Sequence, residues 1–254
     1  MKRFLLFAFF VAGTIVCTDA LAQTKPAAKP AVKKSTTATK KTIVKRPGTT
    51  SAVKKVVAVD KSIRVKITTD SGVIVVKLYD STPLHRDNFV KLVKQGFYDS
   101  LLFHRVIAGF MIQGGDPQSK YAPSGSMLGS GGGDMARIPA EFRTSLIHKK
   151  GALAAARDGN PEKASSACQF YIVDGRVSSD AELDNLEAYQ GRKYTAAQRA
   201  IYKTIGGTAQ LDMNYTVFGE VISGLNVIAK IANVPKAPGD RPVGDVRMKM
   251  EVVK

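Results

Sequence analysis

The stretch "FHRVIAGFMIQGGDP", Phe103 to Pro117, is the most informative part of the sequence for both fold and function. Most of its residues are apolar and suit a strand, but Arg105 and Gln113 carry long polar side chains. A strand packed wholly in a core has little use for such groups, because burying them unpaired costs free energy. Alternate residues of a strand share a face, so the sequence predicts that Arg105, Met111 and Gln113 lie together.

The regularity of this strand determines on which face two further residues, Phe110 and His104, lie. Phe110 has the opposite parity and reaches the Arg105 side only through a bend near Gly109. His104 points away from Arg105 if the strand is regular. We therefore predict one polar face on this run, with Phe110 added to it by a bend.

The segment "SIRVKITTDSGVIVVKLYD", residues 62–80, alternates apolar and polar side chains on both sides of Asp70-Ser71-Gly72. A period of two is typical of a strand with one buried face, and the central tripeptide is a turn sequence. The segment predicts a β-hairpin whose core-facing side chains are Ile63, Val65, Ile67, Ile74, Val76 and Leu78.

Residues 81–99 change to a helical period. Thr82 can cap a helix and Pro83 suits its first turn, while Gly96 supplies a stop. The apolar residues of one face are Phe89, Leu92 and Val93. We predict a helix of about three turns, by the spacing of these signals.

Strand-like segments return at residues 168–173, 215–222 and 247–253, whereas residues 178–207 carry helical signals. Within 178–207, two pairs have the spacing of a capping box, and two glycines end the second helix: Ser179 with Glu182, Thr195 with Gln198, and Gly206-Gly207. Many strands and few helices, without alternation, favour a mainly β fold built as an antiparallel sheet or a closed barrel.

The glycine-rich segment at residues 123–134 raises the question of phosphate binding. It lacks the Lys-Ser/Thr of a P-loop, and its glycines do not have the spacing of a dinucleotide-binding fingerprint. We therefore predict a flexible connection here.

The first 22 residues have the pattern of a secretory signal peptide. Lys2 and Arg3 precede an apolar run that is too short to span a bilayer comfortably, and Ala20-Leu21-Ala22 fits a cleavage site. An uncleaved anchor is the alternative; a lipoprotein would use Cys17, but a small residue is wanted where Val16 stands. We expect export, with the periplasm favoured over full secretion.

Residues 23–61 are rich in Lys, Ala, Pro and Thr and are predicted to be a disordered basic linker. Residues 1–61 hold 13 Lys or Arg and two Asp, a net charge of +11, against +6 for the remainder. A solvated spacer is one interpretation, and attachment to an anionic envelope surface is the other. Export argues against nucleic acid as a partner.

Cysteine and histidine are scarce in the mature chain. Cys168 is its one cysteine, so no internal disulfide forms, and its small or apolar neighbours predict a buried thiol. The three histidines form no HExxH or His/Cys cluster, so we expect no metal site.

Four segments in this order resemble the cyclophilin-type peptidyl-prolyl cis-trans isomerases: "FHRVIAGFMIQGGDP", "GALAAAR", "SSACQFYIV" and "YTVFGEVISGLNVI". The resemblance implies a closed eight-stranded antiparallel β-barrel capped by helices, covering residues 62–254, with a helical insertion at about 173–209. It implies an isomerase that acts on X-Pro bonds in unfolded or extended proline-containing polypeptides, assists folding of exported proteins and needs no cofactor. We expect a monomer.

The resemblance also assigns site residues. Arg105 and Gln113 match the family's catalytic positions. The residues that match substrate-binding positions are His104, Phe110, Met111, Ala156, Arg157, Gln169, Tyr171, Leu211 and Tyr215. Tyr171 stands where Phe is more common and Tyr215 where His is common, and either the core or the pocket would suit Tyr171.

The chain departs from the family pattern in two places. It has no tryptophan, and Gln210 aligns best with the position that favours cyclosporin binding, so we expect reduced sensitivity. The insertion is either a helical decoration or a device for substrate choice or partner binding. Two further functions stay open: a proline-peptide binding module, and a scaffold attached through the basic linker.

Overall fold

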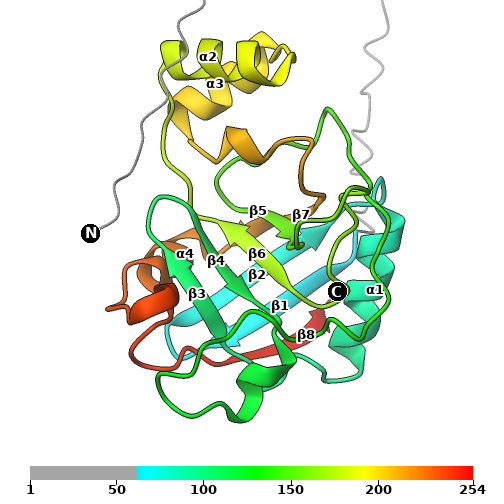
Figure 1. The fold of residues 1–254 in the computed structure, drawn as a ribbon, viewed down its shortest axis with the longest axis vertical. Helices are drawn as coiled ribbons and strands as arrows, with labels where there is room; N and C mark the ends of the chain where they lie inside the picture. The colour runs from blue at the N-terminus through cyan, green and yellow to red at the C-terminus, as the bar shows by residue number, and fades with distance from the viewer. Residues whose placement is uncertain (1–61, 254) are drawn as a thin grey trace, which may run out of the picture. The chain divides into compact units, whose positions relative to one another are not determined.

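The computed structural model describes residues 62–253, so the predicted signal peptide and basic linker lie outside the described residues. The described part is mainly β, with eight antiparallel strands in one curled sheet ordered β3-β4-β6-β5-β7-β2-β1-β8 (Figure 1). The strands are β1 Arg64–Thr69, β2 Gly72–Leu78, β3 Phe103–Ile107, β4 Met111–Gly114, β5 Ala152–Ala155, β6 Phe170–Val173, β7 Val217–Ser223 and β8 Met248–Val253.

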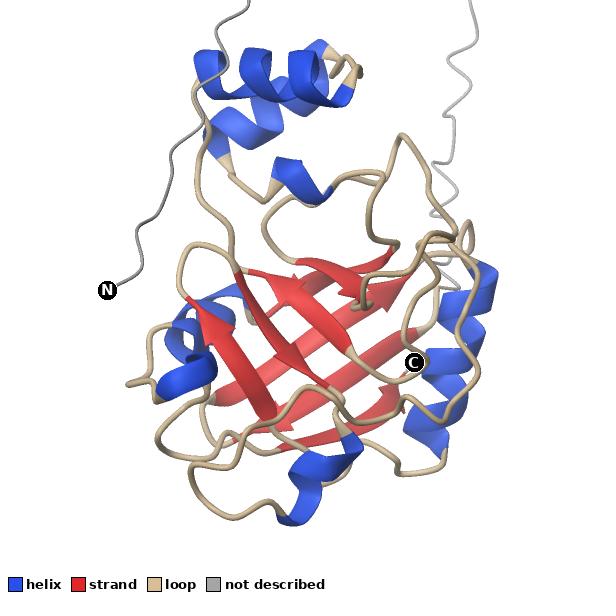
Figure 2. Cartoon of the chain, in the orientation of Figure 1, coloured by secondary structure: helices blue, strands red, loops and turns tan. Residues whose placement is uncertain are grey.

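Four α-helices and three short 3-10 helices connect these strands (Figure 2). The α-helices are α1 Pro83–Lys94, α2 Asp180–Gln190, α3 Ala196–Thr204 and α4 Leu225–Ala232, and the 3-10 helices are η1 Pro117–Tyr121, η2 Ala209–Leu211 and η3 Pro238–Asp240. None of the helices in residues 62–253 is long and apolar enough to cross a bilayer.

The predicted N-terminal hairpin is confirmed. β1 and β2 pair in antiparallel register from Arg64 opposite Lys77 to Thr69 opposite Gly72. Five of the six predicted core-facing side chains are buried, and Ile63 is half-buried against the same core.

The predicted helix is α1, and its apolar face is buried as expected. Thr82 is the N-cap residue, but its hydroxyl donates to the Tyr79 carbonyl and not to the helix. The Glu141 carboxylate accepts from the first backbone N–H groups instead, Leu84 at 3.2 Å and His85 at 3.0 Å. A side chain 57 positions away in sequence thus caps this helix.

The sheet is an open, curled half-barrel, so the predicted closed barrel is wrong. Its edge strands are β3 and β8, which form no ladder with each other; just before the two strands, Leu102 and Arg247 form an isolated bridge. The chain that continues this bridge alongside β3 is Pro242 to Val246, which forms no strand. Proline has no N–H for a ladder, and Gly244 favours a turn over a strand, so the seam stays open.

Side chains from all eight strands, together with α1 and α4, fill the inner side of the curl. A smaller apolar cluster lies on the outer side and includes Met111, Ala152, Ala154, Tyr171 and Val217. Alanines on the outer face of β5 leave space there, because a methyl group fills little volume. The outer cluster is where the candidate site forms.

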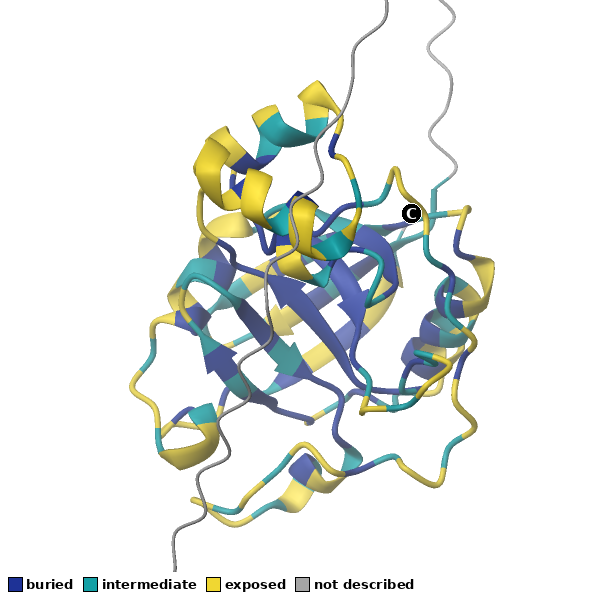
Figure 3. Cartoon of the chain, turned by 45° about the horizontal axis from the view of Figure 1, so that its top comes forward, coloured by how far each residue is buried: buried dark blue, intermediate teal, exposed yellow. Residues whose placement is uncertain are grey.

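The helical insertion forms a lobe at one end of the half-barrel, with mostly exposed helices (Figure 3). Both predicted capping boxes are present, Ser179 with Glu182 on α2 and Thr195 with Gln198 on α3. A third buried cluster joins the lobe to the barrel: Ile147, Leu183, Tyr194, Tyr202 and Ala209.

Candidate active site

The run that opened the sequence analysis folds as two strands and a tight turn. β3 and β4 pair with Arg105 opposite Gln113 and Ile107 opposite Met111. Directly paired residues share a face of the sheet, so Arg105, Met111 and Gln113 lie together as predicted. The expected bend is the turn at Gly109, whose φ of 71° brings Phe110 to the same side.

A β-bulge interrupts β3 at His104. The register shifts between Phe103 and Arg105, and Phe103 and Val106 both enter the inner core although they are three positions apart, an odd spacing that would put them on opposite faces of a regular strand. A bulge of this kind adds a residue on one strand and re-aims its neighbours. The bulge therefore lets Phe103 enter the inner core, while Arg105, next to the inward-facing Val106, lies on the outer face.

His104 itself is covered. Its side chain is 3% exposed, and the ring lies against Gly129: a Cβ added at Gly129 would lie 3.6 Å from His104 Nε2. Burial lowers the pKa of His104 to about 4. The predicted substrate-binding His104 lines neither of the cavities described below, so the structure does not bring it into contact with a ligand there.

Nine of the predicted site residues surround one small cavity of about 110 Å³ on the outer face. Five lie on β3, the following turn, β4 and β6: Arg105, Phe110, Met111, Gln113 and Tyr171. Ala156 and Arg157 follow β5, and Leu211 and Tyr215 follow the insertion. The floor is apolar, with Met111 2% exposed and Tyr171 4% exposed. The sequence thus identified a set of residues that the fold gathers from four separate segments.

Arg105 stands at the rim of this small cavity. Its side chain is 42% exposed, so the guanidinium is accessible from solvent. Nη1 lies 3.4 Å from Gln113 Oε1, and Nε lies 3.8 Å from an Asp240 carboxylate oxygen. The guanidinium is therefore oriented by two neighbours without being sealed in an ion pair.

The orientation of Gln113 follows from a chain of amide contacts. Gln169 Nε2 donates to the carbonyls of Gly129 and Gly131, both at 2.9 Å, so its Oε1 is left to accept. Gln113 Nε2 donates to that oxygen at 3.0 Å, which leaves Gln113 Oε1 facing Arg105. Gln169, 7% exposed, thus acts on the small cavity through Gln113.

Arg157 and Tyr215 form the opposite wall. The Arg157 guanidinium lies 4.7 Å from the centroid of the Tyr215 ring and donates to the Asn214 carbonyl at 2.8 Å. The Tyr215 ring in turn meets Tyr171 edge to face at 5.9 Å. Cation–π and edge contacts of this kind fix the rings that line the cavity.

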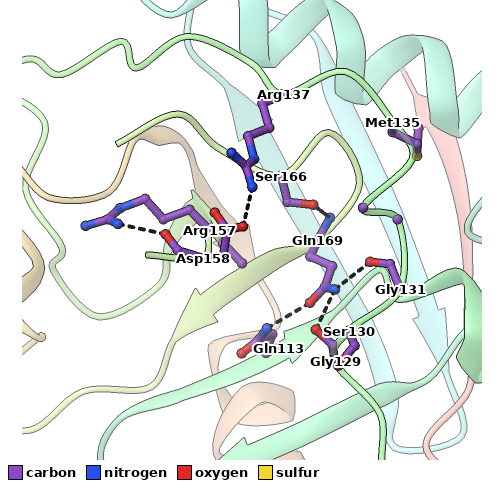
Figure 4. Close-up of a pocket in the computed structure, with 13 residues that line it drawn as sticks. Gln113, Gly129, Ser130, Gly131, Met135, Arg137, Arg157, Asp158, Ser166 and Gln169 are labelled. Atoms are coloured by element: carbon purple, nitrogen blue, oxygen red, sulfur yellow. Dashed lines mark hydrogen bonds and ion pairs between the residues drawn. The ribbon is translucent and has the colours of Figure 1, made fainter. Parts of the chain in front are cut away.

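A second cavity of about 380 Å³ adjoins the first and shares Gln113, Ala156 and Arg157 with it (Figure 4). Its other wall is Gly129–Gly133, which the sequence analysis treated as a flexible connection. A Cβ at Gly132 would collide with the buried Cys168 sulfur, and Gly132 has a φ of 84°. Gly132 is therefore needed for close packing, a reason that only the contact with Cys168 reveals.

Two charged residues of this second cavity were also missed. Arg137 and Asp158 form an exposed ion pair across its mouth (Figure 4). Asp116 holds the glycine loop by accepting from the Gly129 N–H. Asp116 lies in the motif Phe103 to Pro117, but the residue pattern of that motif does not predict a partner 13 residues away.

Within residues 62–253 no three His, Cys, Asp or Glu side chains gather as a group that could hold a metal ion. Cys168 is 1% exposed in the inner core, as its neighbours predicted, and burial raises the pKa of its thiol. The chemistry that the small cavity offers is therefore a guanidinium beside an apolar hollow.

Comparison with known proteins places this geometry in a family. The chain matches the sequence model of the family "Cyclophilin type peptidyl-prolyl cis-trans isomerase/CLD" over residues 64–252. A Staphylococcus epidermidis protein named "Putative peptidyl-prolyl cis-trans isomerase" is 36% identical over 188 residues, which cover 74% of this chain and 89% of that protein. A Staphylococcus aureus protein of the same name is 36% identical over 185 residues, 72% of this chain and 88% of that protein.

Solved structures share the fold. A Cryptosporidium parvum cyclophilin-type isomerase superposes with a TM-score of 0.57 at 23% identity, covering 76% of this chain and 98% of that one. The same isomerase in the presence of the dipeptide Ala-Pro superposes with a TM-score of 0.54, covering 75% and 99%.

Proposed function

This chain belongs to the cyclophilin-type peptidyl-prolyl cis-trans isomerases, and on that premise we propose that Arg105 and the small cavity perform the rotation of X-Pro bonds in exported proteins. The observation that carries the proposal is an accessible guanidinium at the rim of an apolar hollow.

The reaction needs a donor that distinguishes a twisted imide from a planar one. Rotation breaks amide resonance, with a barrier of about 18–20 kcal/mol. At the transition state the proline nitrogen becomes pyramidal and its lone pair can accept a hydrogen bond, which the planar ground state offers hardly at all. A donor aimed at that nitrogen therefore lowers the barrier selectively.

Arg105 suits this role because a guanidinium stays charged and presents rigidly spaced N–H groups. The Arg105 Nη1–H donates to Gln113 Oε1, and the guanidinium has further N–H groups that can point over the cavity. Gln113 is in this scheme a residue that orients Arg105.

The apolar floor would hold the proline ring while the rest of the chain rotates. Met111, Phe110 and Leu211 provide that surface, and Tyr171 closes one side. A dry hollow also strengthens the hydrogen bond from Arg105, because the local dielectric constant falls. The Ala-Pro dipeptide studied with the Cryptosporidium parvum relative supports proline-containing peptides as the substrate class.

The exported setting rests on the sequence of residues 1–61. A signal peptide would deliver a monomeric domain to the periplasm, where newly exported chains fold, and the basic linker would act as a spacer or attach to anionic envelope surfaces. Cell fractionation checks this placement: the mature chain in the periplasmic fraction supports it, and a cytoplasmic precursor contradicts it.

A proline-peptide binding module is the second candidate, since the hollow alone would bind proline. Arg105 separates the two, because binding does not need a donor at the imide nitrogen. In a proline-isomerisation assay Arg105→Ala should lower kcat/KM by about 100-fold or more, as loss of a transition-state donor does. The control is Arg176→Ala, an exposed arginine on the insertion paired with Glu182. An inactive wild type with intact peptide binding would favour the binding module.

A further inference from the structure

A chain of buried hydrogen bonds joins the insertion to the small cavity. The Tyr202 hydroxyl, on α3, donates to Asp212 Oδ2 at 2.6 Å. Asp212 Oδ1 lies 2.8 Å from His148 Nδ1, and His148 Nε2 lies 2.9 Å from the Tyr171 hydroxyl. Tyr171 is one of the residues that line the cavity.

All four side chains of this relay are buried. His148 and Tyr202 are fully buried, Asp212 is 2% exposed and Tyr171 is 4% exposed. Hydrogen bonds in such surroundings are strengthened by the low dielectric constant, and an unpaired polar group there is costly. The relay therefore fixes the geometry of its members more firmly than surface contacts would.

Proton positions follow from the carboxylate. Asp212 can only accept, so Tyr202 and His148 Nδ1–H both donate to it. In the neutral ring, His148 Nε2 then accepts from the Tyr171 hydroxyl. The His148 and Tyr171 rings are nearly parallel, at 14°. The relay has one consistent direction from Tyr171 through His148 to Asp212.

Asp212 is also tied to the wall of the cavity through the backbone. It follows Leu211 directly, and its carboxylate accepts from the His148 backbone N–H at 2.8 Å. The His148 backbone carbonyl accepts a hydrogen bond from the Thr208 N–H at 2.8 Å, at the start of η2. The Asp212 carboxylate thus helps to hold two cavity residues in place: Leu211, which precedes it in the chain, and Tyr171, which it reaches through His148.

The insertion supplies two groups to this carboxylate. Tyr202 comes from α3, and Arg192, between α2 and α3, places Nη1 3.4 Å from Oδ2. Without Tyr202, one oxygen of a buried carboxylate would lose its hydrogen bond. The insertion is therefore attached to the site by a charged group that cannot be left unpaired at low cost.

We propose that Tyr202, Asp212 and His148 are positioning residues for the isomerase reaction, which set Tyr171 and Leu211 in the proline-holding hollow, so that the insertion is a support of that hollow. The inference rests on the proposed function of the small cavity. It also explains a tyrosine at position 171: a phenylalanine ring would fill the space but could not be fixed by His148.

The test is Tyr202→Phe, which removes one hydroxyl from the relay and keeps the ring. We expect KM for a proline peptide to rise about two- to tenfold, the range for losing one buried hydrogen bond, with kcat close to wild type. The hollow holds the proline in the ground state and the transition state alike, so its loosening appears in KM. Partial unfolding alone would lower the apparent kcat and leave KM unchanged.

A double-mutant cycle shows whether the effect travels through Tyr171. Tyr171→Phe cuts the relay at its other end, so adding Tyr202→Phe to it should change KM no further, while thermal stability should fall in both backgrounds. A second, additive rise in KM overturns the proposal. The matched control is Gln198→Ala, which loosens α3 from the Thr144 carbonyl without touching the relay and should leave KM unchanged.

Arg192→Gln serves as the second variant if Tyr202→Phe does not fold. It removes the cation 3.4 Å from the same carboxylate and should also raise KM. Wild-type activity with an unchanged KM in both variants overturns the relay and leaves the proposed function intact. A wild type without isomerase activity overturns the proposed function itself.

Discussion

The half-barrel and the insertion are stabilised in different ways. The barrel core is apolar, and Phe170 at its centre packs edge to face on Phe89, Tyr98 and Phe103 at 5.6 to 6.1 Å. The insertion has a smaller apolar cluster and adds many ion pairs to it: Arg199 contacts three acidic residues, namely Asp180, Asp184 and Glu187. The barrel should therefore respond to changes of volume, and the insertion to changes of charge.

The candidate site lies where these two regions meet. Arg105, Met111 and Tyr171 stand on barrel strands, whereas Leu211 and Tyr215 follow the insertion in sequence. The catalysis that we propose for Arg105 should thus survive a loosened insertion, while the proposed binding of the proline ring should not. Variants and conditions that act on one region alone test whether the half-barrel and the insertion differ in this way.

The largest effect is expected from the barrel core. Phe170→Ala removes a ring that is 1% exposed, and cavities of this kind cost about 3–5 kcal/mol. Urea unfolding monitored by far-UV circular dichroism should show one transition at a much lower midpoint. A loss confined to the insertion, seen by hydrogen exchange, would contradict the division between the two regions.

The next largest effect is a pH dependence in the barrel. Burial keeps the pKa of His104 at about 4, so the native ring stays neutral while the unfolded ring takes up a proton below its ordinary value. Stability is then fully present above about pH 6.5 and falls by at most about 3 kcal/mol as the pH drops to 4. Unfolding midpoints measured across this range check it.

His104→Leu provides the control, because it cannot titrate. Its profile should be flatter between pH 6.5 and 4, with a residual slope from His85, whose pKa burial also lowers. The insertion should hold in this range, since the pKa of Glu187 is lowered to about 2 by Lys193 and the Tyr194 N–H. Its contribution is lost only as the pH falls from about 4.5 toward 2. An unchanged slope in His104→Leu would exclude His104 as the cause.

A smaller and local effect is expected from Arg199→Ala. The change leaves Asp180 and Glu187 with fewer cationic partners and weakens the contact between α2 and α3. Hydrogen exchange should speed up in both helices while the barrel transition stays in place. Lys193→Ala is the control, since Lys193 contacts Glu187 but is 86% exposed and should matter less. Equal effects of the two changes would argue against a special role for Arg199.

The smallest effect is expected from salt. Between 0.1 M and 1 M salt the screening length falls from about 10 Å to 3 Å. Exchange in α2 and α3 should quicken modestly, and exchange in β1 and β2 should change less, because the core-facing contacts of these strands are apolar. Equal changes in both regions, measured peptide by peptide, would remove the distinction.

Much of the site was predictable because one short motif holds it. Arg105, Met111 and Gln113 lie within nine positions; the hairpin register pairs Arg105 with Gln113, and Met111 lies two residues before Gln113 on the same face. The bulge at His104 was not predictable from alternation, since an extra residue in a strand leaves no mark on composition. It brings Phe103 into the inner core together with Val106, and His104 beside it is covered.

The alternation of apolar and polar residues could not show whether the barrel closes. Strand patterns locate strands, but closure requires the first and last edges to pair along their length. Pro242 and Gly244 were visible in the sequence as poor strand residues, yet only the fold places that segment beside β3.

The sequence alone determined what depends on near neighbours: the β1–β2 hairpin, the apolar face of α1, both capping boxes, and the residues of the motif. These interactions join residues a few positions apart, so spacing records them. The tertiary structure decided the partners of buried polar groups, such as Glu141 on α1, 57 positions from Leu84, and Asp212 on His148, 64 positions away. A buried donor or acceptor must find a partner wherever the fold brings one, and that requirement carries no fixed distance along the chain.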